Sequence, residues 1–138
     1  MHEADNSKGL TRQARFHARR MKKALEPLRS VHRTISLQLA FTFLHVAYDE
    51  GLTVSALATR CNVSNTAMSR HLRDLGSVNR HGKTGLELVT VTQRIYGDRR
   101  EYRVILTQRG AMVARQMIAA LRPATDLRRA AEGEPGRA

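Results

Sequence analysis

The 138-residue chain has few of the residues that mark disulfide-bonded, secreted or membrane-embedded proteins. Cys61 is its single cysteine, which excludes an internal disulfide and gives no sign of an oxidising compartment. No apolar run approaches the roughly 20 residues that a membrane-spanning helix needs, and the polar N-terminus lacks the apolar stretch of a signal peptide. We therefore expect a cytoplasmic protein with no membrane among its partners.

Aromatic residues are also scarce, at 4% of the chain with no tryptophan, so the core must be built mainly from aliphatic side chains and methionine. This scarcity argues against an RNA-binding or single-strand-binding function, because such proteins stack bases on aromatic rings. The six histidines do not pair at close spacing near other ligand residues, so we predict no metal site. The sequence shows neither a phosphate-cradling glycine loop nor a nucleophile–base pair, so we expect neither an enzyme nor a bound cofactor.

Acidic residues are outnumbered two to one: 12 Asp and Glu stand against 24 Lys and Arg, for a net charge of +12. Such an excess attracts polyanions, above all nucleic acids. The charge is unevenly distributed, because residues 34–59 contain no Lys or Arg whereas residues 1–33 contain nine. The pattern favours an apolar core element that is followed by a basic binding face.

Hydrophobic spacing and capping residues predict four successive helices, at Thr11–Glu26, Thr34–Asp49, Val54–Cys61 and Ser64–Leu75. Pro27 is expected to end or kink the first helix or to start the next turn, and the second helix is apolar nearly all round, so we predict that most of its sides are buried. Thr53 and Ser64 are the expected N-caps of the third and fourth helices, and Gly76 is the expected C-cap of the fourth.

The remaining sequence predicts a mobile loop, a hairpin and a last helix. Their expected positions are the loop Gly76–Gly85, a strand Leu86–Ile95, a turn Tyr96–Arg100, a strand Tyr102–Leu106, and a helix that Thr107 opens and Pro123 stops or kinks. The fold class is thus mainly α with a small β-hairpin, in the order α-α-α-α-β-β-α. We divide the chain into a basic N-terminal arm at 1–33, a winged helix-turn-helix domain at 34–106, and a C-terminal helix with a flexible tail at 107–138.

The two short helices joined by a tight turn form a helix-turn-helix pattern, whose second helix lies in the major groove of duplex DNA. Its apolar face is formed by Met68, Leu72 and Leu75. Its polar face offers side chains that bond base edges or phosphates: Asn65, Thr66, Ser69, Arg70 and Arg73. Ser64, as the cap of this helix, can present the helix N-terminus to a phosphate.

The hairpin that follows supports the DNA-binding interpretation. Arg99 and Arg100 stand at its tip, where a guanidinium can enter the narrow, electronegative minor groove beside the recognition helix. Neither the helix-turn-helix pattern nor the hairpin arginines alone distinguish a DNA-binding surface from one that only faces solvent, but together they favour DNA binding.

These residues resemble the MarR-type winged helix-turn-helix transcriptional regulators. The resemblance rests on the run Leu57–Ser64, on Met68-Ser69-Arg70 and Leu72–Leu75, and on the wing run Asp98-Arg99-Arg100 with Leu106-Thr107 and Gly110 at the family spacing. It implies a homodimer on a pseudo-palindromic duplex site, with the first and last helices as the dimer interface. It also implies that Arg99 enters the minor groove and that Asp98 braces the wing arginines.

The chain departs from that family in two places. The loop Gly76–Gly85 is longer and more basic than the usual connection to the wing, and we expect Arg80 and Lys83 to add DNA-backbone contacts there. Pro123 shortens the last helix, so the N-terminal arm must carry more of the dimer interface.

Several residues permit two interpretations. Packing is favoured over redox sensing for Cys61, and His71 either touches phosphate or faces solvent. Phe41, Phe43 and Leu44 either line the pocket of a small-molecule effector or belong to the core. The basic arm is a solvated face, a DNA flank or a contact for another anionic surface, through Arg12, Arg15, Arg19, Arg20, Lys22 and Lys23. The alternative functions are an RNA-binding or a protein-interaction winged-helix module.

Overall fold

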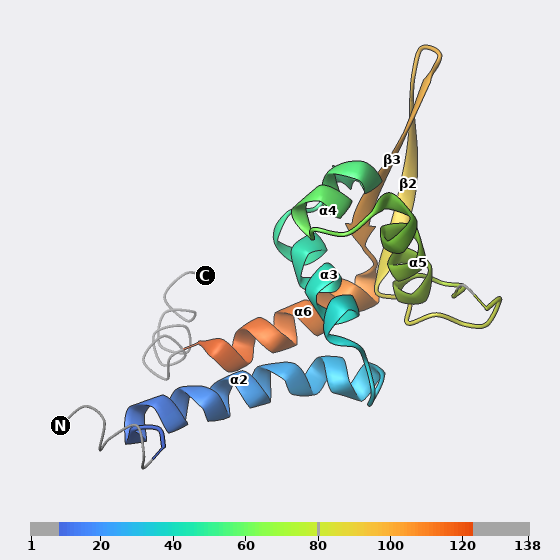
Figure 1. Ribbon diagram of the computed structural model, residues 1–138. Coiled ribbons are helices and arrows are strands. Elements are labelled where there is room, and N and C mark those ends of the chain that lie inside the picture. The colour runs from blue at the N-terminus through green and yellow to red at the C-terminus, as the bar shows by residue number, and fades with distance from the viewer. Residues whose placement is uncertain (1–8, 80, 123–138) are drawn as a thin grey trace, which may run out of the picture. The chain divides into compact units, whose positions relative to one another are not determined.

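The computed structural model describes residues 9–79 and 81–122, in which the chain forms five helices and a three-stranded antiparallel sheet (Figure 1). In chain order the elements are α2 (Arg12–Val31), α3 (Leu37–Tyr48), β1 (Leu52–Thr53), α4 (Val54–Arg60), α5 (Asn65–Leu75), β2 (Val89–Tyr96), β3 (Arg99–Leu106) and α6 (Gln108–Leu121). The predicted mainly α, winged-helix fold is confirmed, and the predicted helices and hairpin strands follow one another in the expected order. The short strand β1 was not predicted.

The described chain divides into two compact units. The first contains residues 9–27 and 116–122, and the second contains residues 28–115. Pro123 and the tail, the first eight residues and residue 80 lie outside the described residues. The three-part domain division at residues 33 and 106 stays a prediction.

The core of the second unit takes one large side chain from almost every element. Phe43, Leu57, Met68 and Val104 are fully buried and come from α3, α4, α5 and β3 respectively. Burial of each such side chain contributes about 1.5–3 kcal/mol, so the α4–α5 pair is held chiefly by this apolar contact. A single core therefore fixes both helices of the helix-turn-helix against the sheet.

The sheet has the strand order β1-β3-β2 and extends beyond α4 and α5 as a long hairpin, the wing (Figure 1). Gly97 and Asp98 alone form its turn, because Tyr96 pairs with Arg99. Gly97 has a φ of +59°, which suits the first central position of a type II′ hairpin turn. The predicted five-residue turn is therefore wrong, and Arg99 and Arg100 belong to a strand.

The first wing strand also begins later than predicted. Glu87 has a φ of +58°, a left-handed conformation that is incompatible with a regular strand, so β2 starts at Val89 rather than Leu86. Leu88 is nevertheless fully buried, and this burial explains why the apolar pattern extended the predicted strand toward it.

Helix α2 continues through Pro27 to Val31, so the prediction that it ends at Glu26 is wrong. Proline lacks the N–H that would bond four residues back and costs about 3 kcal/mol inside a helix. Leu28, which follows directly, is only 1% exposed, and its burial offsets part of this cost. Tertiary packing has here overridden a local signal.

Helix α3 is buried on one face rather than on most sides. Phe43 is fully buried, whereas Phe41 is 58% exposed and Leu44 is also exposed, so these three do not form one pocket or one core cluster within the chain. Polar residues take inward positions instead. The Thr42 hydroxyl donates to the Gln38 carbonyl at 2.9 Å, which satisfies it in the interior.

The predicted N-caps of the two short helices are confirmed. The Thr53 and Ser64 side chains accept from the amides of Ala56 at 3.2 Å and Ala67 at 3.1 Å. Gly76 is the C-cap of α5, but its φ of −93° is open to any residue. Glycine is required there because a Cβ would lie 2.9 Å from the Leu72 carbonyl oxygen.

The loop Gly76–Gly85 is folded back on itself rather than extended. Val78 and Thr84 form an isolated antiparallel bridge, and the Asn79 carboxamide oxygen accepts from the amides of His81 and Lys83 at 2.9 and 3.0 Å. We call this segment the insertion hairpin. Because its backbone is hydrogen-bonded, Lys83 is presented from a defined position.

Candidate nucleic-acid interface

The candidate site is built around α5, which the turn after α4 places on the surface of the second unit. Asn62 adopts a φ of +57°, and the Val63 amide donates to the Ala58 carbonyl at 3.0 Å, which closes the turn. Met68, Leu72 and Leu75 are buried, as predicted from their spacing. The remaining residues of the predicted polar face are all exposed: Ser64, Asn65, Thr66, Ser69, Arg70 and Arg73.

The wing presents its two terminal arginines on opposite faces. Paired residues of an antiparallel hairpin share a face, and successive residues alternate. Arg99, paired with Tyr96, is therefore on the face of Arg94, whereas Arg100, paired with Ile95, is on the other face. Both arginines are exposed, so one guanidinium is available on each side of the wing.

The predicted bracing residue and the observed ion pair of the wing differ. Asp98 is exposed at the turn and forms no ion pair with either arginine within residues 9–79 and 81–122. Glu101 instead accepts from Arg103 at 3.0 Å, and Arg103 also donates to the Gly51 carbonyl at 2.7 Å. Arg103 thereby ties the wing to the residue before β1, while the role of Asp98 stays a prediction.

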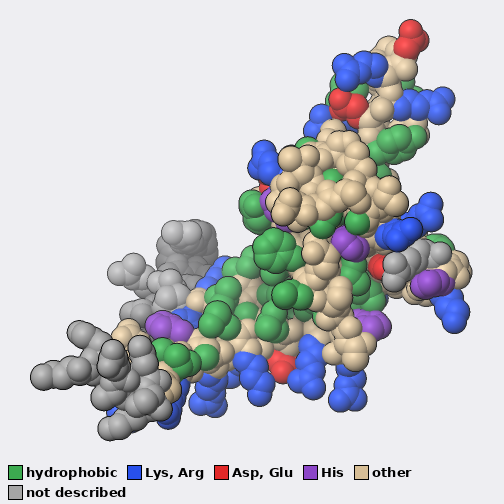
Figure 2. All heavy atoms as spheres, in the orientation of Figure 1, with side chains coloured by type: hydrophobic (Ala, Val, Ile, Leu, Met, Phe, Trp, Pro, Cys, Tyr) green, Lys and Arg blue, Asp and Glu red, His purple; other side chains and the backbone are tan. Residues whose placement is uncertain are grey.

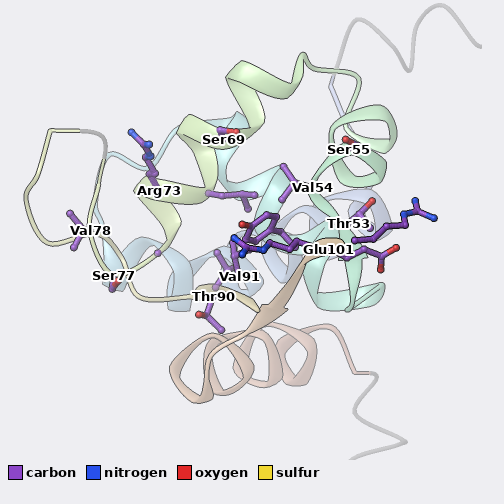
Figure 3. Close-up of a pocket in the computed structure, with 16 residues that line it drawn as sticks. Thr53, Val54, Ser55, Ser69, Arg73, Ser77, Val78, Thr90, Val91 and Glu101 are labelled. Carbon is purple, nitrogen blue, oxygen red and sulfur yellow. The ribbon is translucent and has the colours of Figure 1, made fainter. Parts of the chain in front are cut away.

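A hollow of about 960 Å³ lies between α5 and the base of the wing (Figure 3). Ser69 and Arg73 line it from α5, Thr53 and Ser55 line it at the start of α4, and Arg100 lines it from β3. The groove thus brings four predicted residues to one surface, namely Ser69 and Arg73 of the recognition helix and Arg99 and Arg100 of the wing. Hydroxyl and guanidinium groups of this kind bond phosphate oxygens. The other exposed residues of the predicted polar face do not line it: Ser64, Asn65, Thr66 and Arg70.

The insertion hairpin lies beside the same surface, since Ser77 and Val78 also line the hollow. Lys83 is exposed on this hairpin, whereas Arg80 lies outside the described residues. The sequence interpretation missed Arg94, which is exposed on the wing and extends its positive charge along β2. The strand register that places Arg94 beside Arg99 could have been predicted only with the correct two-residue turn.

The two reactive side chains near the site are partly or wholly inside. Cys61 is buried, and desolvation raises the pKa of its thiol, an effect that a hydrogen bond with Thr42 reduces. His71 is half-buried and lines a second hollow of about 390 Å³ together with His32 and His81. No group of three His, Cys, Asp or Glu in the described parts of the chain is placed to hold a metal ion.

Lys and Arg side chains are visible at the wing end, beside α5 and along α2 in the space-filling view (Figure 2). Of the helices that the structure describes, none is long and apolar enough to cross a membrane.

Neither a family model nor a curated protein matches the sequence, but solved structures match the fold. The crystal structure of RV1404 from Mycobacterium tuberculosis is 24% identical, with a TM-score of 0.60 over 87% of this chain and 76% of that one. The MepR–DNA complex of S. aureus is 17% identical, with a TM-score of 0.59 over 91% of this chain and 93% of that one.

MepR of S. aureus bound to ethidium bromide also matches, at 17% identity and a TM-score of 0.53, over 92% of this chain and 84% of that one. MepR is a transcription regulator of the S. aureus multidrug efflux pump MepA. The resemblance predicted from the helix-turn-helix and wing residues is thus confirmed at the level of architecture: the chain has the winged-helix fold of the MarR-family regulators.

Proposed function

We propose that the chain is a transcriptional regulator that binds specific sequences in duplex DNA as a homodimer. One observation carries the proposal: the exposed Ser69 and Arg73 side chains of α5 and the basic wing line the same groove. The fold shared with the MepR–DNA complex supports the same conclusion.

In the proposed complex, α5 enters the major groove and the wing follows the adjacent minor groove. Arg70 and Asn65 are long enough and exposed enough to make bidentate bonds to purine edges, while Ser69 and Arg73 bond phosphates from the hollow. Arg99 enters the minor groove, and Lys83 adds a contact to the backbone. Arg100, on the opposite wing face, is free to take a different phosphate.

The homodimer is supported by apolar side chains that the first unit leaves exposed. Met21 and Leu25 on α2, and Ile118 and Leu121 on α6, are each at least half exposed. A second copy would remove these side chains from water and so supply the hydrophobic contribution that the single chain lacks.

Selection of bound sequences from a random duplex pool tests the proposal in one experiment. A two-fold symmetric consensus, with half-sites about 34 Å apart, is the expected result. Salt titrations on the selected duplex and on its single strands supply the control, and duplex binding should be the tighter. Equal affinity for both forms would favour an RNA-binding or single-strand-binding module, and absence of binding at low salt would favour a protein-interaction module.

A further inference from the structure

A second basic surface, which the recognition helix and wing do not use, lies on α2. Arg12, Arg15, Arg19, Lys22 and Lys23 are all exposed, and the first acidic residue of the helix is Glu26. We call these five residues the α2 stripe. Figure 2 shows Lys and Arg side chains in a row along this helix.

Helical geometry gathers the stripe on one side. At 3.6 residues per turn its five positions fall within an arc of about 100° and span about 17 Å along the axis. Ala14, Ala18, Met21 and Leu25 lie on a different arc of the helix, centred about 120° from the stripe. The cations therefore form one continuous face that is separate from the apolar face.

The stripe works against the stability of its own helix. Neighbours at spacings of three and four, such as Arg15 with Arg19 and Arg19 with Lys23, place like charges side by side and repel each other. The first turn holds no acidic residue, so Arg12 and Arg15 also face the positive end of the helix dipole. Glu26 lies on the same face, four residues after Lys22 and three after Lys23, and offsets part of this repulsion at the C-terminal end of the stripe. Within residues 9–79 and 81–122, no stripe side chain forms a hydrogen bond or an ion pair.

Arg20, outside the stripe, shows what a structural arginine on this helix does. Its guanidinium lies 5.8 Å from the Phe16 ring centre and donates to the Leu121 carbonyl of α6. The stripe side chains make no such internal contact in the part of the chain that the structure describes. A polyanion outside the chain would remove their mutual repulsion.

We propose that the α2 stripe binds the phosphate backbone of duplex DNA without reading bases. Three of its five members are arginines, whose planar fork matches phosphate oxygens. Phosphates of one strand rise by about 3.4 Å each along the duplex axis, so a stripe about 17 Å long covers the axial rise of about five base pairs. A membrane-binding amphipathic helix needs its apolar side chains free to insert into the bilayer, whereas Met21 and Leu25 of this helix belong to the proposed dimer interface.

The inference rests on the proposed function only in its choice of duplex DNA as the polyanion. It adds a sequence-independent contact to the base-reading one and predicts that part of the affinity survives on any duplex. The two proposals can therefore be tested separately. Sequence-specific binding by α5 and the wing predicts the ratio of affinities for two duplexes, whereas backbone binding by the α2 stripe predicts the salt dependence that both duplexes share.

The test combines Arg15→Gln, Arg19→Gln and Lys22→Gln in the full chain. The matched control, Arg33→Gln, Arg115→Gln and Arg122→Gln, removes three charges from other exposed positions. Binding is measured from 50 to 200 mM salt, a range of about fourfold, on the selected duplex and on a scrambled one. The stripe variant should lower the log–log salt slope by about 2.7 for each bound protomer, which is about 5.4 for the proposed dimer. It should also weaken binding to both duplexes by about tenfold or more, with their affinity ratio unchanged.

The proposal is overturned if the stripe variant and the control variant bind both duplexes alike. Single substitutions guard against misfolding, because Arg15→Gln and Arg19→Gln should each lower the slope by about 0.9 for each bound protomer. A drop in the affinity ratio alone would assign the residues to base reading instead. Binding of the wild-type chain to phosphatidylserine vesicles or to polyglutamate, abolished by the triple substitution while DNA binding is kept, would replace DNA by a membrane or by an acidic protein.

Discussion

At the scale of single residues, position on an element decides what each arginine can do. Arg70 and Arg73 lie one turn apart on the exposed side of α5, and only Arg73 lines the hollow at the wing base. Arg99 and Arg100 are neighbours in sequence but are on opposite wing faces. Residues of one type are therefore expected to divide between base reading and backbone contact.

Replacement of Arg70 by alanine should relax sequence preference and cost about 1–3 kcal/mol of binding to the selected duplex, because a bidentate base contact is lost. Lys83→Ala is the comparison: it should weaken binding to the selected and scrambled duplexes equally and reduce the salt slope by about 0.9 for each bound protomer. Competition binding with both duplexes distinguishes the two effects. Unchanged specificity in Arg70→Ala would refute its assignment to base reading.

Gly110→Ala should destabilise the fold by about 3 kcal/mol although alanine is the better helix former. A Cβ at this position would lie 2.0 Å from the Leu88 carbonyl oxygen, so backbone would have to move. Urea unfolding measures the loss. Ala119→Gly, at an exposed position of the same helix, is the control: it measures the difference in helix propensity between alanine and glycine alone, about 1 kcal/mol. An unchanged unfolding midpoint for Gly110→Ala would contradict the steric argument.

The thiol of Cys61 should react slowly with alkylating reagents, and its burial should lower the stability of the fold at high pH. Burial raises its pKa in the folded chain, so the unfolded thiol ionises first as the pH rises past the ordinary value of 9.0. The stabilising contribution is present below that value and is lost as the pH rises through the folded pKa. Iodoacetamide labelling at pH 8 should be slower in buffer than in urea, and equal rates would show an accessible thiol.

At the scale of elements, the caps and the buried faces of the short helices could be predicted because their signals are local. Ser64 and Thr53 accept the expected amides, and Met68, Leu72 and Leu75 are inside. The misassigned features depend on distant partners. The continuation of α2 past Pro27 depends on the burial of Leu28, and β1 exists only because Leu52 pairs with Val104.

In the candidate site, too, features with a local signal could be predicted and features that depend on distant residues could not. The polar face of α5 was predictable from a helical period, whereas the exposure of Phe41 depends on which side of α3 meets the rest of the fold. The positions of Arg99 and Arg100 depend on a two-residue turn rather than on composition. Arg103 was overlooked because its partner Gly51 lies 52 residues away in sequence.

Ser64→Ala should cost about 1 kcal/mol of stability, since the Ala67 amide loses its acceptor at the start of α5. Affinity for the selected duplex should fall as well, because fraying begins at Asn65 and Thr66. Ser55→Ala is the matched control for the unfolding measurement alone, because Ser55 lines the hollow but its side chain caps no amide in the described structure. Similar unfolding midpoints for the two variants would show that the cap is not stabilising.

At the scale of the whole molecule, the described chain consists of two units with different surfaces. The 28–115 unit contains the helix-turn-helix and the wing, and the other unit exposes apolar side chains and the α2 stripe. In the proposed regulator, one unit reads DNA and the other joins two readers into a symmetric pair. Affinity for a two-fold site then depends on a surface that touches no base.

Leu25→Glu should convert the dimer into a monomer, because a charge at this half-exposed apolar position opposes burial in an interface. Sedimentation gives the mass, and binding should fall on the two-fold site far more than on an isolated half-site. Gln13→Glu adds the same charge at an exposed polar position of α2 and should leave the dimer intact. A monomeric wild-type chain at micromolar concentration would contradict the proposed assembly.

The uninterrupted pairing of β2 with β3 limits how such a wing can change in length. Every residue from Val89 to Tyr96 has a partner, and Gly97 and Asp98 leave no slack in the turn. Removal of one cross-strand pair would bring the tip about 3.4 Å closer to the base and also exchange the sides on which Arg99 and Arg100 emerge. The length of the wing can therefore change only by two cross-strand pairs at a time, or about 7 Å, if Arg99 and Arg100 are each to stay on the same side.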